Sequence, residues 1–422
     1  TNEGYIGEGM LSGTVTDNFA LRLTGRYRQT DGYVENEFLD NDEPNIEEWN
    51  YRFTGVWAPS DNLDVEFKWG QSNLDRTGVA SGVTEYADPA TRDALFPNRD
   101  AFADIAYSIT DAFYPNFPDI IGNDFTIFKD NNFGPGGEAG GVAVGQYAES
   151  SDQDTDNGAL TLNYRLNEFE ITAITGYSAY DYVDGCDCDW LPLQFIGRDD
   201  DQQFDQWSQE IRIASPTGGF FEYLAGAYYE QNTLKFDRRV TIDTNLGGLV
   251  REQLGVDSLL TLLTGGQYNA NQLARNHRFE QDTDSWAIFG QGTFNLRDDL
   301  RLTLGLRYTE ETKEVKSSQF ISDDITGIDN RTDNFFAYQV EATSFNTYLY
   351  DYDEDRDTDA LLPSANLQWD VSANSMLYLS YSEGFCGRRQ PGRSGPGHLA
   401  LFSRATAGRL LRRDAAQRRV RV

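Results

Sequence analysis

Two-residue alternation of apolar and polar side chains constrains this chain more than any other feature. In residues 300–308, one face carries Leu300, Leu302, Leu304, Leu306 and Tyr308, and the other carries Arg301, Thr303, Gly305 and Arg307. Only an extended strand, whose side chains repeat every two residues, separates those sets. The same alternation follows residues 18 and 62 and precedes residue 166. We therefore predict an all-β chain.

Short polar turns join these strands in pairs, and much longer acidic segments separate the pairs. The turns are Val15–Asn18, Pro59–Asn62, Leu166–Glu168, Ser215–Gly219, Leu296–Asp299 and Val371–Asn374. The long segments cover residues 29–48, 73–156, 181–205, 232–284 and 311–360. A tilted strand of about 10 residues spans the apolar wall, about 25 Å tall, of an outer-membrane barrel. The pattern predicts twelve strands of an antiparallel transmembrane β-barrel, with short periplasmic turns and long extracellular loops.

The positions of the large aromatic residues support a membrane location. Trp57 and Trp369 lie beside short turns, whereas the strand ends next to long loops carry Tyr27, Tyr51, Tyr177, Trp207, Tyr229, Trp286 and Tyr308. We expect two aromatic belts, one at each edge of the apolar wall. No segment approaches the roughly 18 consecutive apolar residues of a membrane-spanning helix, so strands are expected to cross the membrane.

The formal charge divides the chain in two. Residues 386–422 contain ten Arg and one Asp, a net charge of +9. Because the whole chain has a formal net charge of −33, residues 1–385 carry a net charge of −42. So large an acidic excess argues against nucleic acid as a partner of the main body. Outer-membrane lipid and lipopolysaccharide are the partners that we expect for the wall.

Cys186 and Cys188 lie close together in a predicted loop, in the segment Asp184–Trp190. They are interpreted as a small local disulfide or as two free thiols. A metal site is the competing interpretation, but two thiolates without nearby His or further Cys supply too few ligands. We predict neither a metal nor a cofactor.

Three segments carry a resemblance to a known family. Leu362–Trp369 followed by Asn374–Phe385 resembles the barrel region of TonB-dependent outer-membrane receptors, in which a tight turn leads into a Tyr-x-Ser-Tyr-Ser-x-Gly-Phe segment. Leu11–Tyr27 with Asp31–Tyr33 is similar to the first barrel hairpin after the plug domain. Ile288–Phe294 with Leu304–Thr309 resembles a middle hairpin. The segments occur in the family's order, and the resemblance extends over residues 1–385.

The resemblance implies a barrel of about 22 strands with a plug in its lumen, energised through a segment that contacts the TonB complex. The sequence departs from that pattern because no plug domain and no TonB-contacting segment are found in it, and about 12 of the strands are predicted. We therefore expect residues 1–385 to be a partial barrel domain, and contact with TonB to require the missing plug.

Residues 386–422 form an Arg-rich tail without strand alternation. Our main interpretation is a non-native tail that arises from a reading-frame slip near codon 385. A disordered basic arm and an amphipathic surface helix near residues 399–413 are the alternatives.

Two sets of residues are candidates for ligand contact. In the longest loop, Phe113, Tyr114 and Phe117 could clasp a ligand by stacking, or they could form a small self-packed loop core. Facing the lumen, arginines could meet an anionic solute or plug carboxylates, or could be hydrated and paired across strands. The lumen candidates are Arg22, Arg26, Arg52, Arg301 and Arg307, with Arg165 as a further inward residue.

Two further loop features have plain interpretations. The apolar residues within Leu246–Leu263 predict one short helix. Alternating aspartates at positions 351, 353, 355, 357 and 359 lack the Gly and terminal Glu of an EF-hand. They are interpreted as the solvated face of a loop.

Enzyme chemistry is not expected, because only two His occur and neither a nucleophile elbow, a P-loop nor a metal triad is found. We expect a fragment of a TonB-dependent receptor in the cell outer membrane that takes up a scarce solute, by the resemblance a ferric siderophore. The alternatives are a passive porin-like channel and a soluble β-rich surface adhesin.

Overall fold

A computed structural model of the chain describes most of the residues up to 384. The described ranges are 3–83, 108–116, 126–129, 132–133, 137–139, 142–144, 147–246, 249–256, 258–263, 265–266, 272–322, 338–339, 342, 348–372 and 375–384. Phe117 and the tail at residues 386–422 lie outside these ranges, so the predictions made for them stay predictions.

Twelve long strands form one antiparallel sheet in the order β1-β2-β5-β6-β12-β13-β14-β15-β16-β17-β18-β19. Their bounds are β1 Gly4–Thr16, β2 Phe19–Thr30, β5 Asn45–Ser60, β6 Leu63–Thr77, β12 Ser150–Leu166, β13 Phe169–Asp187, β14 Ile196–Ala214, β15 Phe221–Asp243, β16 Gln272–Arg297, β17 Leu300–Ser322, β18 Tyr350–Ser372 and β19 Ser375–Ser382. Within the described residues, β1 and β19 each pair with one neighbour only. The prediction of twelve antiparallel strands is confirmed.

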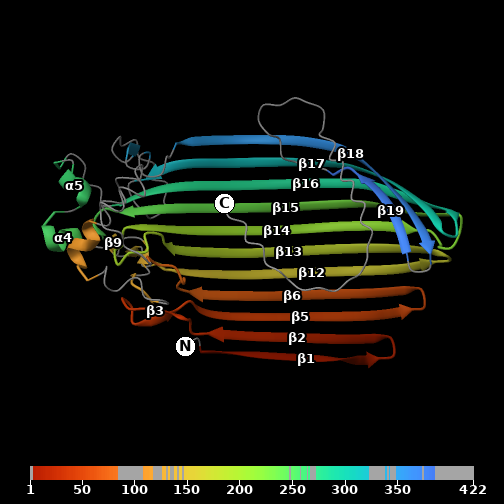
Figure 1. The fold of residues 1–422 in the computed structure, drawn as a ribbon, viewed down its shortest axis with the longest axis horizontal. Helices are drawn as coiled ribbons and strands as arrows, with labels where there is room; N and C mark the ends of the chain where they lie inside the picture. The colour runs from red at the N-terminus through yellow and green to blue at the C-terminus, as the bar shows by residue number, and fades with distance from the viewer. Residues whose placement is uncertain are drawn as a thin grey trace.

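The connections between strands differ at the two ends of the sheet. All six tight turns lie at one end, and all the long connections lie at the other (Figure 1). The turn after β12 contains Asn167 with a φ of 57°, a left-handed conformation that Asn adopts more readily than most residues. This asymmetry is the one that the sequence predicts for an outer-membrane barrel wall.

The two faces of the sheet differ in chemistry as the alternation requires. On the outer face, Leu304 and Leu306 are 45% and 50% exposed, and no helix or sheet among the described elements covers them. Aromatic rings on this face contact one another across strands. The ring centroids of Trp69 and Tyr177 are 5.8 Å apart, and those of Trp286 and Tyr308 are 5.5 Å apart. An uncovered apolar face with aromatic residues along its edge is the surface that lipid requires.

Several strands extend further than the sequence predicts. β15 continues to Asp243, β17 continues to Ser322 and β18 begins at Tyr350, so the long loops are shorter than expected. The alternating aspartates 351–359 lie within β18 and not in a loop, which corrects that part of their interpretation. Their side chains are spread along the strand on one face, so they do not converge on a cation. The predicted ends of these strands were wrong because both faces of a strand become polar where it extends beyond the apolar wall. The apolar and polar alternation that marks a strand in the sequence is then lost, although the strand continues.

The buried apolar core lies at the end of the sheet that carries the long connections, where residues of those connections pack against the ends of β15, β16 and β17. It consists of Leu191, Leu193, Phe195, Ile242, Leu246, Val250, Leu273 and Ile321. Two short helices contribute to this region, α4 at Leu249–Leu254 and α5 at Leu259–Leu263, separated by Gly255 with a φ of 69°. This corrects the single helix predicted for residues 246–263. Among the described residues, no helix is long and apolar enough to cross a membrane.

Short strands complete the loop region. They are β3 Val34–Asn36, β4 Asn41–Glu43 and β7 Thr126–Ile127 in one small sheet, β8 Asn132–Phe133 with β11 Tyr147–Ala148, and β9 Gly137–Ala139 with β10 Val142–Val144. The parallel pairing of β3 with β7 joins the first long connection to the second.

Candidate functional site

A row of charged side chains crosses the inner face of the sheet next to the loop core. Asp184 on β13 lies opposite Asp200 on β14, which lies opposite Arg238 on β15, which lies opposite His277 on β16. Alternation places these residues on the face opposite Tyr177, Trp207, Tyr229 and Trp286, which point outward. The row therefore lies on the inner wall, at the end of the strands that carries the long connections.

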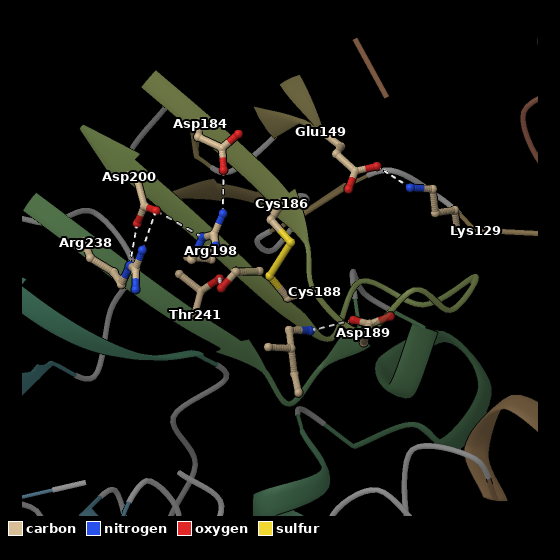
Figure 2. The surroundings of a disulfide bond; sticks show 12 residues. Lys129, Glu149, Asp184, Cys186, Cys188, Asp189, Arg198, Asp200, Arg238 and Thr241 are labelled. Atoms are coloured by element: carbon tan, nitrogen blue, oxygen red, sulfur yellow. Dashed lines mark hydrogen bonds and ion pairs between the residues drawn. A yellow bond between two sulfur atoms is a disulfide. The ribbon is translucent and has the colours of Figure 1, made fainter. Parts of the chain in front are cut away.

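Two buried aspartates are neutralised by three arginines in this row. Arg238 donates two hydrogen bonds of 2.7 Å to the carboxylate of Asp200, and Arg198 approaches Asp200 at 3.3 Å. Arg198 also pairs with Asp184, which Arg76 of β6 approaches at 3.4 Å (Figure 2). The side chains of Asp200 and Asp184 are 7% and 10% exposed. Charges this deeply buried need partners, because an unpaired buried charge is costly. We refer to Arg76, Asp184, Arg198, Asp200 and Arg238 as the mouth ion network.

Aromatic rings adjoin the mouth ion network on the same inner face. Tyr180 stacks on Phe204 with ring centroids 5.4 Å apart, and the Gln202 amide donates a 2.6 Å hydrogen bond to the Tyr180 hydroxyl. The Arg238 guanidinium lies 4.9 Å from the centre of the Phe236 ring.

A second group of rings continues across β16 and β18. The ring centroids of Phe236 and His277 are 5.8 Å apart. The His277 and Tyr350 centroids are 6.2 Å apart, and those of Tyr350 and Tyr352 are 5.9 Å apart. We refer to Tyr180, Phe204, Phe236, Tyr350 and Tyr352 as the mouth aromatic group. Charged and aromatic side chains thus lie together on one patch of wall drawn from β13 to β18.

A disulfide between Cys186 and Cys188 lies at the end of β13 beside this patch (Figure 2). The pair forms a local disulfide, which is one of the two interpretations given above for these cysteines. Neither sulfur is then a free thiol. The Asp189 carboxylate accepts backbone hydrogen bonds from Leu191 at 2.9 Å and Ile196 at 2.7 Å. Together these bonds close the connection between β13 and β14 over the inner wall. The described residues contain no group of three or more His, Cys, Asp or Glu that could hold a metal ion.

Lys129 forms a buried node that joins the first two long connections. Its side chain is fully buried, pairs with Glu149 and lies 3.7 Å from Glu43. The Asn36 amide donates hydrogen bonds of 2.9 Å to Glu43 and 3.1 Å to the Lys129 carbonyl. Burial raises the pKa of Glu149, and the charge of Lys129 opposes that shift. We refer to Asn36, Glu43, Lys129 and Glu149 as the loop node.

The predicted lumen arginines do not form one group. Arg22, Arg26 and Arg52 line a hollow of about 880 Å³ on the inner face of β1 to β13. Arg26 is paired with Glu8 at 3.2 Å and with Glu48 at 3.6 Å. This hollow lies on the N-terminal half of the sheet, away from the mouth aromatic group.

The other predicted arginines lie on β12 and β17. Arg301 pairs with Asp370 at 2.5 Å near the tight turns, and Arg165 pairs with Asp64 at 2.6 Å. Arg307 lies over the rings of Tyr228 and Phe289 at 5.8 and 5.6 Å. The structure does not bring these arginines together with Arg22, Arg26 and Arg52.

The predicted aromatic clasp is packed into the loop region as far as the structure describes it. Phe113 ends a helical stretch at residues 108–113, and Tyr114 follows it. The Tyr114 ring contacts Phe38 at 5.9 Å and Phe128 at 6.1 Å. These contacts favour the self-packed loop core, because they occupy the ring that a ligand would need.

Neither the mouth ion network nor the mouth aromatic group was predicted from the sequence. Apart from Tyr180, their residues lie in segments that were predicted to be loops, where the alternation was not followed. The signal was present: in β13 to β15, the even-numbered positions that point inward lower in the wall continue through Tyr180, Phe204 and Phe236 to Arg238.

Comparison with known proteins agrees with this architecture. A family model described as TonB dependent receptor-like, beta-barrel matches residues 88–386. A search of curated protein sequences found no match.

Two solved structures are similar in fold. The ferric yersiniabactin uptake receptor FyuA from Yersinia pestis has a TM-score of 0.56 and 13% identity, over 89% of this chain and 44% of that one. The ferric-catecholate import receptor Fiu from E. coli K12, in its open form, has a TM-score of 0.52 and 11% identity, over 90% of this chain and 53% of that one. The chain thus spans about half the length of the structures that it resembles.

Proteins of this family are outer-membrane transport receptors and not enzymes, in keeping with the outward apolar face and the asymmetric connections described above. Because the family model covers well over half of the sequence, the chain belongs to the TonB-dependent receptor β-barrel family.

Proposed function

We propose that this chain supplies part of the wall and mouth of a receptor for the active uptake of a ferric siderophore. The observation that carries the proposal is the inner-wall patch at the mouth, where the arginines of the mouth ion network adjoin the mouth aromatic group. Small-molecule sites are usually lined by apolar and aromatic side chains with a few placed polar groups, and this patch supplies both kinds of side chain. The two similar structures named above are a ferric yersiniabactin uptake receptor and a ferric-catecholate import receptor.

In the proposed mechanism, the mouth captures the chelate and a plug domain releases it into the periplasm when the TonB complex pulls on the plug. This chain contributes capture. Its outer face contacts outer-membrane lipid, and its loop region lies next to lipopolysaccharide. The predicted ligand contacts Arg22, Arg26 and Arg52 line a hollow lower on the inner wall, which a solute would meet after leaving the mouth.

The test is a binding panel on the full 422-residue chain folded in detergent micelles. Iron chelates, cobalamin and maltohexaose are each measured by equilibrium dialysis. Saturable binding of one or more ferric chelates supports the proposal. Binding of cobalamin or maltohexaose without binding of any ferric chelate would overturn it.

A further inference from the structure

We infer that a recess on the outer face of β2, β5 and β6 binds one acyl chain of a phospholipid whose headgroup carries a primary ammonium group. The recess has a volume of about 500 Å³ and is lined by apolar side chains around Gly55, with Thr16 and Asn18 at the end nearest the tight turns. It lies on the face of the sheet opposite to the mouth ion network, so the inference goes beyond the proposed function and does not depend on it.

The first argument is the pattern of outward residues around Gly55. Leu21 and Phe67 lie directly opposite Gly55 on the two neighbouring strands, and Phe53 and Trp57 lie two residues before and after it on β5. All five share the register of the outward ring on β6 described above, so they lie on the outer face. A position without a side chain is thus surrounded on four sides by large apolar side chains.

These side chains form the walls of the recess, and Gly55 forms its floor. Gly55 is the one buried residue of β5, whereas Trp57 and Phe67 are 46% and 39% exposed. The ring centroids of Phe53 and Phe67 are 6.0 Å apart. A Cβ atom placed on Gly55 would lie 3.5 Å from Leu21 and 3.6 Å from the Phe53 ring, which are ordinary contact distances. The walls therefore leave the space above the glycine open.

The surroundings of the recess determine what fills it. The apolar face of an outer-membrane barrel lies in hydrocarbon, and its tight turns face the periplasm. The recess therefore opens into the periplasmic leaflet of the membrane. Empty space beside the rings would forfeit dispersion contacts, and a water molecule would find no polar partners on the apolar floor. A flexible acyl chain is the component of the leaflet that can enter a slot one side chain wide.

The polar end of the recess lies at the level where the ester and phosphate groups of a lipid begin. Thr16 donates a 2.8 Å hydrogen bond to the side-chain oxygen of Asn18. The backbone amide of Ala58 donates a 2.8 Å hydrogen bond to the Asn18 carbonyl, which holds this residue beside β5. Nδ2 of Asn18 donates no hydrogen bond to the described residues, so its two N–H groups remain for a lipid oxygen.

The charge near the turns favours a headgroup with an ammonium group. Asp17 and Asp61 are exposed in the two turns that close these strands, and neither forms an ion pair with the described residues. Neither turn contains Lys or Arg. The cations of the adjoining strand ends lie on the inner face, where Arg22 lines the hollow and Arg165 pairs with Asp64 at 2.6 Å. Because opposite charges attract, an ethanolamine headgroup fits this edge better than an anionic one.

The experiment compares two lipids that have the same chains and different headgroups, dioleoyl phosphatidylethanolamine and dioleoyl phosphatidylglycerol. Each is titrated into the full 422-residue chain folded in detergent micelles, and native mass spectrometry counts the lipids that the chain retains. We expect the first lipid retained to be phosphatidylethanolamine, with an apparent affinity about threefold above that of phosphatidylglycerol.

Variants test the floor of the recess and its polar end separately. Gly55→Leu fills the recess and is expected to lower the apparent affinity for phosphatidylethanolamine about tenfold. The matched control is Gly13→Leu, opposite Leu21 on the same face, where nothing lies within 4 Å of an added Cβ atom; it should keep the parental affinity. Replacing Asp17 and Asp61 together by Asn should abolish the headgroup preference. Gly55→Ala, with an expected loss of about threefold, replaces Gly55→Leu if that variant does not fold.

Each result supports or overturns the inference. Parental lipid retention by a Gly55→Leu chain that circular dichroism shows to be folded would overturn it, and so would an equal loss for Gly13→Leu, because the recess would then have no special role. Equal or preferred retention of phosphatidylglycerol would overturn the assignment of the headgroup. Retention of a second copy of the chain in place of lipid, lost in Gly55→Leu, would make the recess a protein contact and overturn the lipid. None of these results bears on the proposed function, which concerns the inner face.

Discussion

Lys129 is the residue whose surroundings depend most on a single charge. Glu43 and Glu149 are both nearly inaccessible to solvent and both face its ammonium group. Replacing one member of a buried ion pair leaves the other charge unpaired, which typically costs about 3–5 kcal/mol. The packing of the first two long connections against each other therefore depends on the Lys129 side chain.

Lys129→Met is expected to destabilise the loop region by about that amount and to leave the wall intact. Hydrogen exchange of the amides in β3, β4 and the start of β12 should quicken strongly, while exchange in β16 and β17 should not change. Lys235→Met on the outer face is the control, and it should affect neither region. Unchanged protection of β3 and β4 in Lys129→Met would contradict the role of the node.

Glu149 gives the mouth a pH dependence of known sign. Burial raises its pKa in the folded state above the ordinary value of 4.5, so the folded loop region binds this proton more readily than the unfolded one. The stability contributed by this group is fully present below its ordinary pKa and is lost as pH rises through the raised value. Acidification from neutral pH toward about pH 5 should therefore raise the protection factors of the loop amides, which correct their exchange rates for the intrinsic effect of pH on amide exchange.

Glu149→Gln is expected to remove that part of the pH dependence. The measurement is the difference in loop-amide exchange between variant and parent across the same pH series. Asp42→Asn, at an exposed position of β4, should keep the parental profile. A Glu149→Gln profile as steep as the parental one would mean that another group causes the dependence.

At the scale of single elements, the interiors of the strands were predictable and their outer ends were not. Leu300–Tyr308 could be placed correctly because apolar and polar residues alternate there. Asp237 to Arg239 could not, because both faces of β15 carry charge at that level. The pair Arg238 and Asp200 lies 38 residues apart, and the register that brings them together follows from the turn at residues 215–220 and from the length of β14. Following the parity of Trp207 and Tyr229 beyond the expected strand ends would have found the mouth ion network.

Gly226 shows how closely neighbouring strands approach on the inner face. A Cβ atom placed there would lie 2.6 Å from Cζ of Phe289 and 2.7 Å from the Ile211 carbonyl oxygen. Because one of these atoms is backbone, the contact cannot be relieved by a side-chain rotation alone. β15 therefore requires glycine at this level.

Gly226→Ala is expected to lower the free energy of unfolding by about 1–3 kcal/mol. The measurement is the urea midpoint of the chain in detergent micelles. Gly13→Ala on β1 is the matched control, because nothing lies within 4 Å of its added methyl group, and its midpoint should not fall. A parental midpoint for Gly226→Ala would show that the strands can separate without cost.

At the scale of the whole molecule, the outer and inner faces should respond oppositely to an added charge. Leu304 lies on the apolar outer face and Thr303 on the inner face of the same strand. Leu304→Arg is expected to cost about 2–4 kcal/mol in a lipid environment, because the guanidinium would be placed in hydrocarbon. Thr303→Arg should cost much less, since the inner wall is polar. Urea titration in lipid–detergent micelles compares the two, and equal costs would contradict the assignment of the faces.

The location of the buried apolar core has a consequence for how the molecule comes apart. Leu193, Ile242 and their neighbours are held together by expulsion of water, whereas the wall relies on hydrocarbon around it. The stability of the core thus depends on water, and the stability of the wall depends on the surrounding hydrocarbon. Denaturant in the aqueous phase should unfold the loop region first, while the twelve long strands stay paired. Exchanging one amphiphile for another should shift the second unfolding step, that of the strands, and leave the first step unchanged.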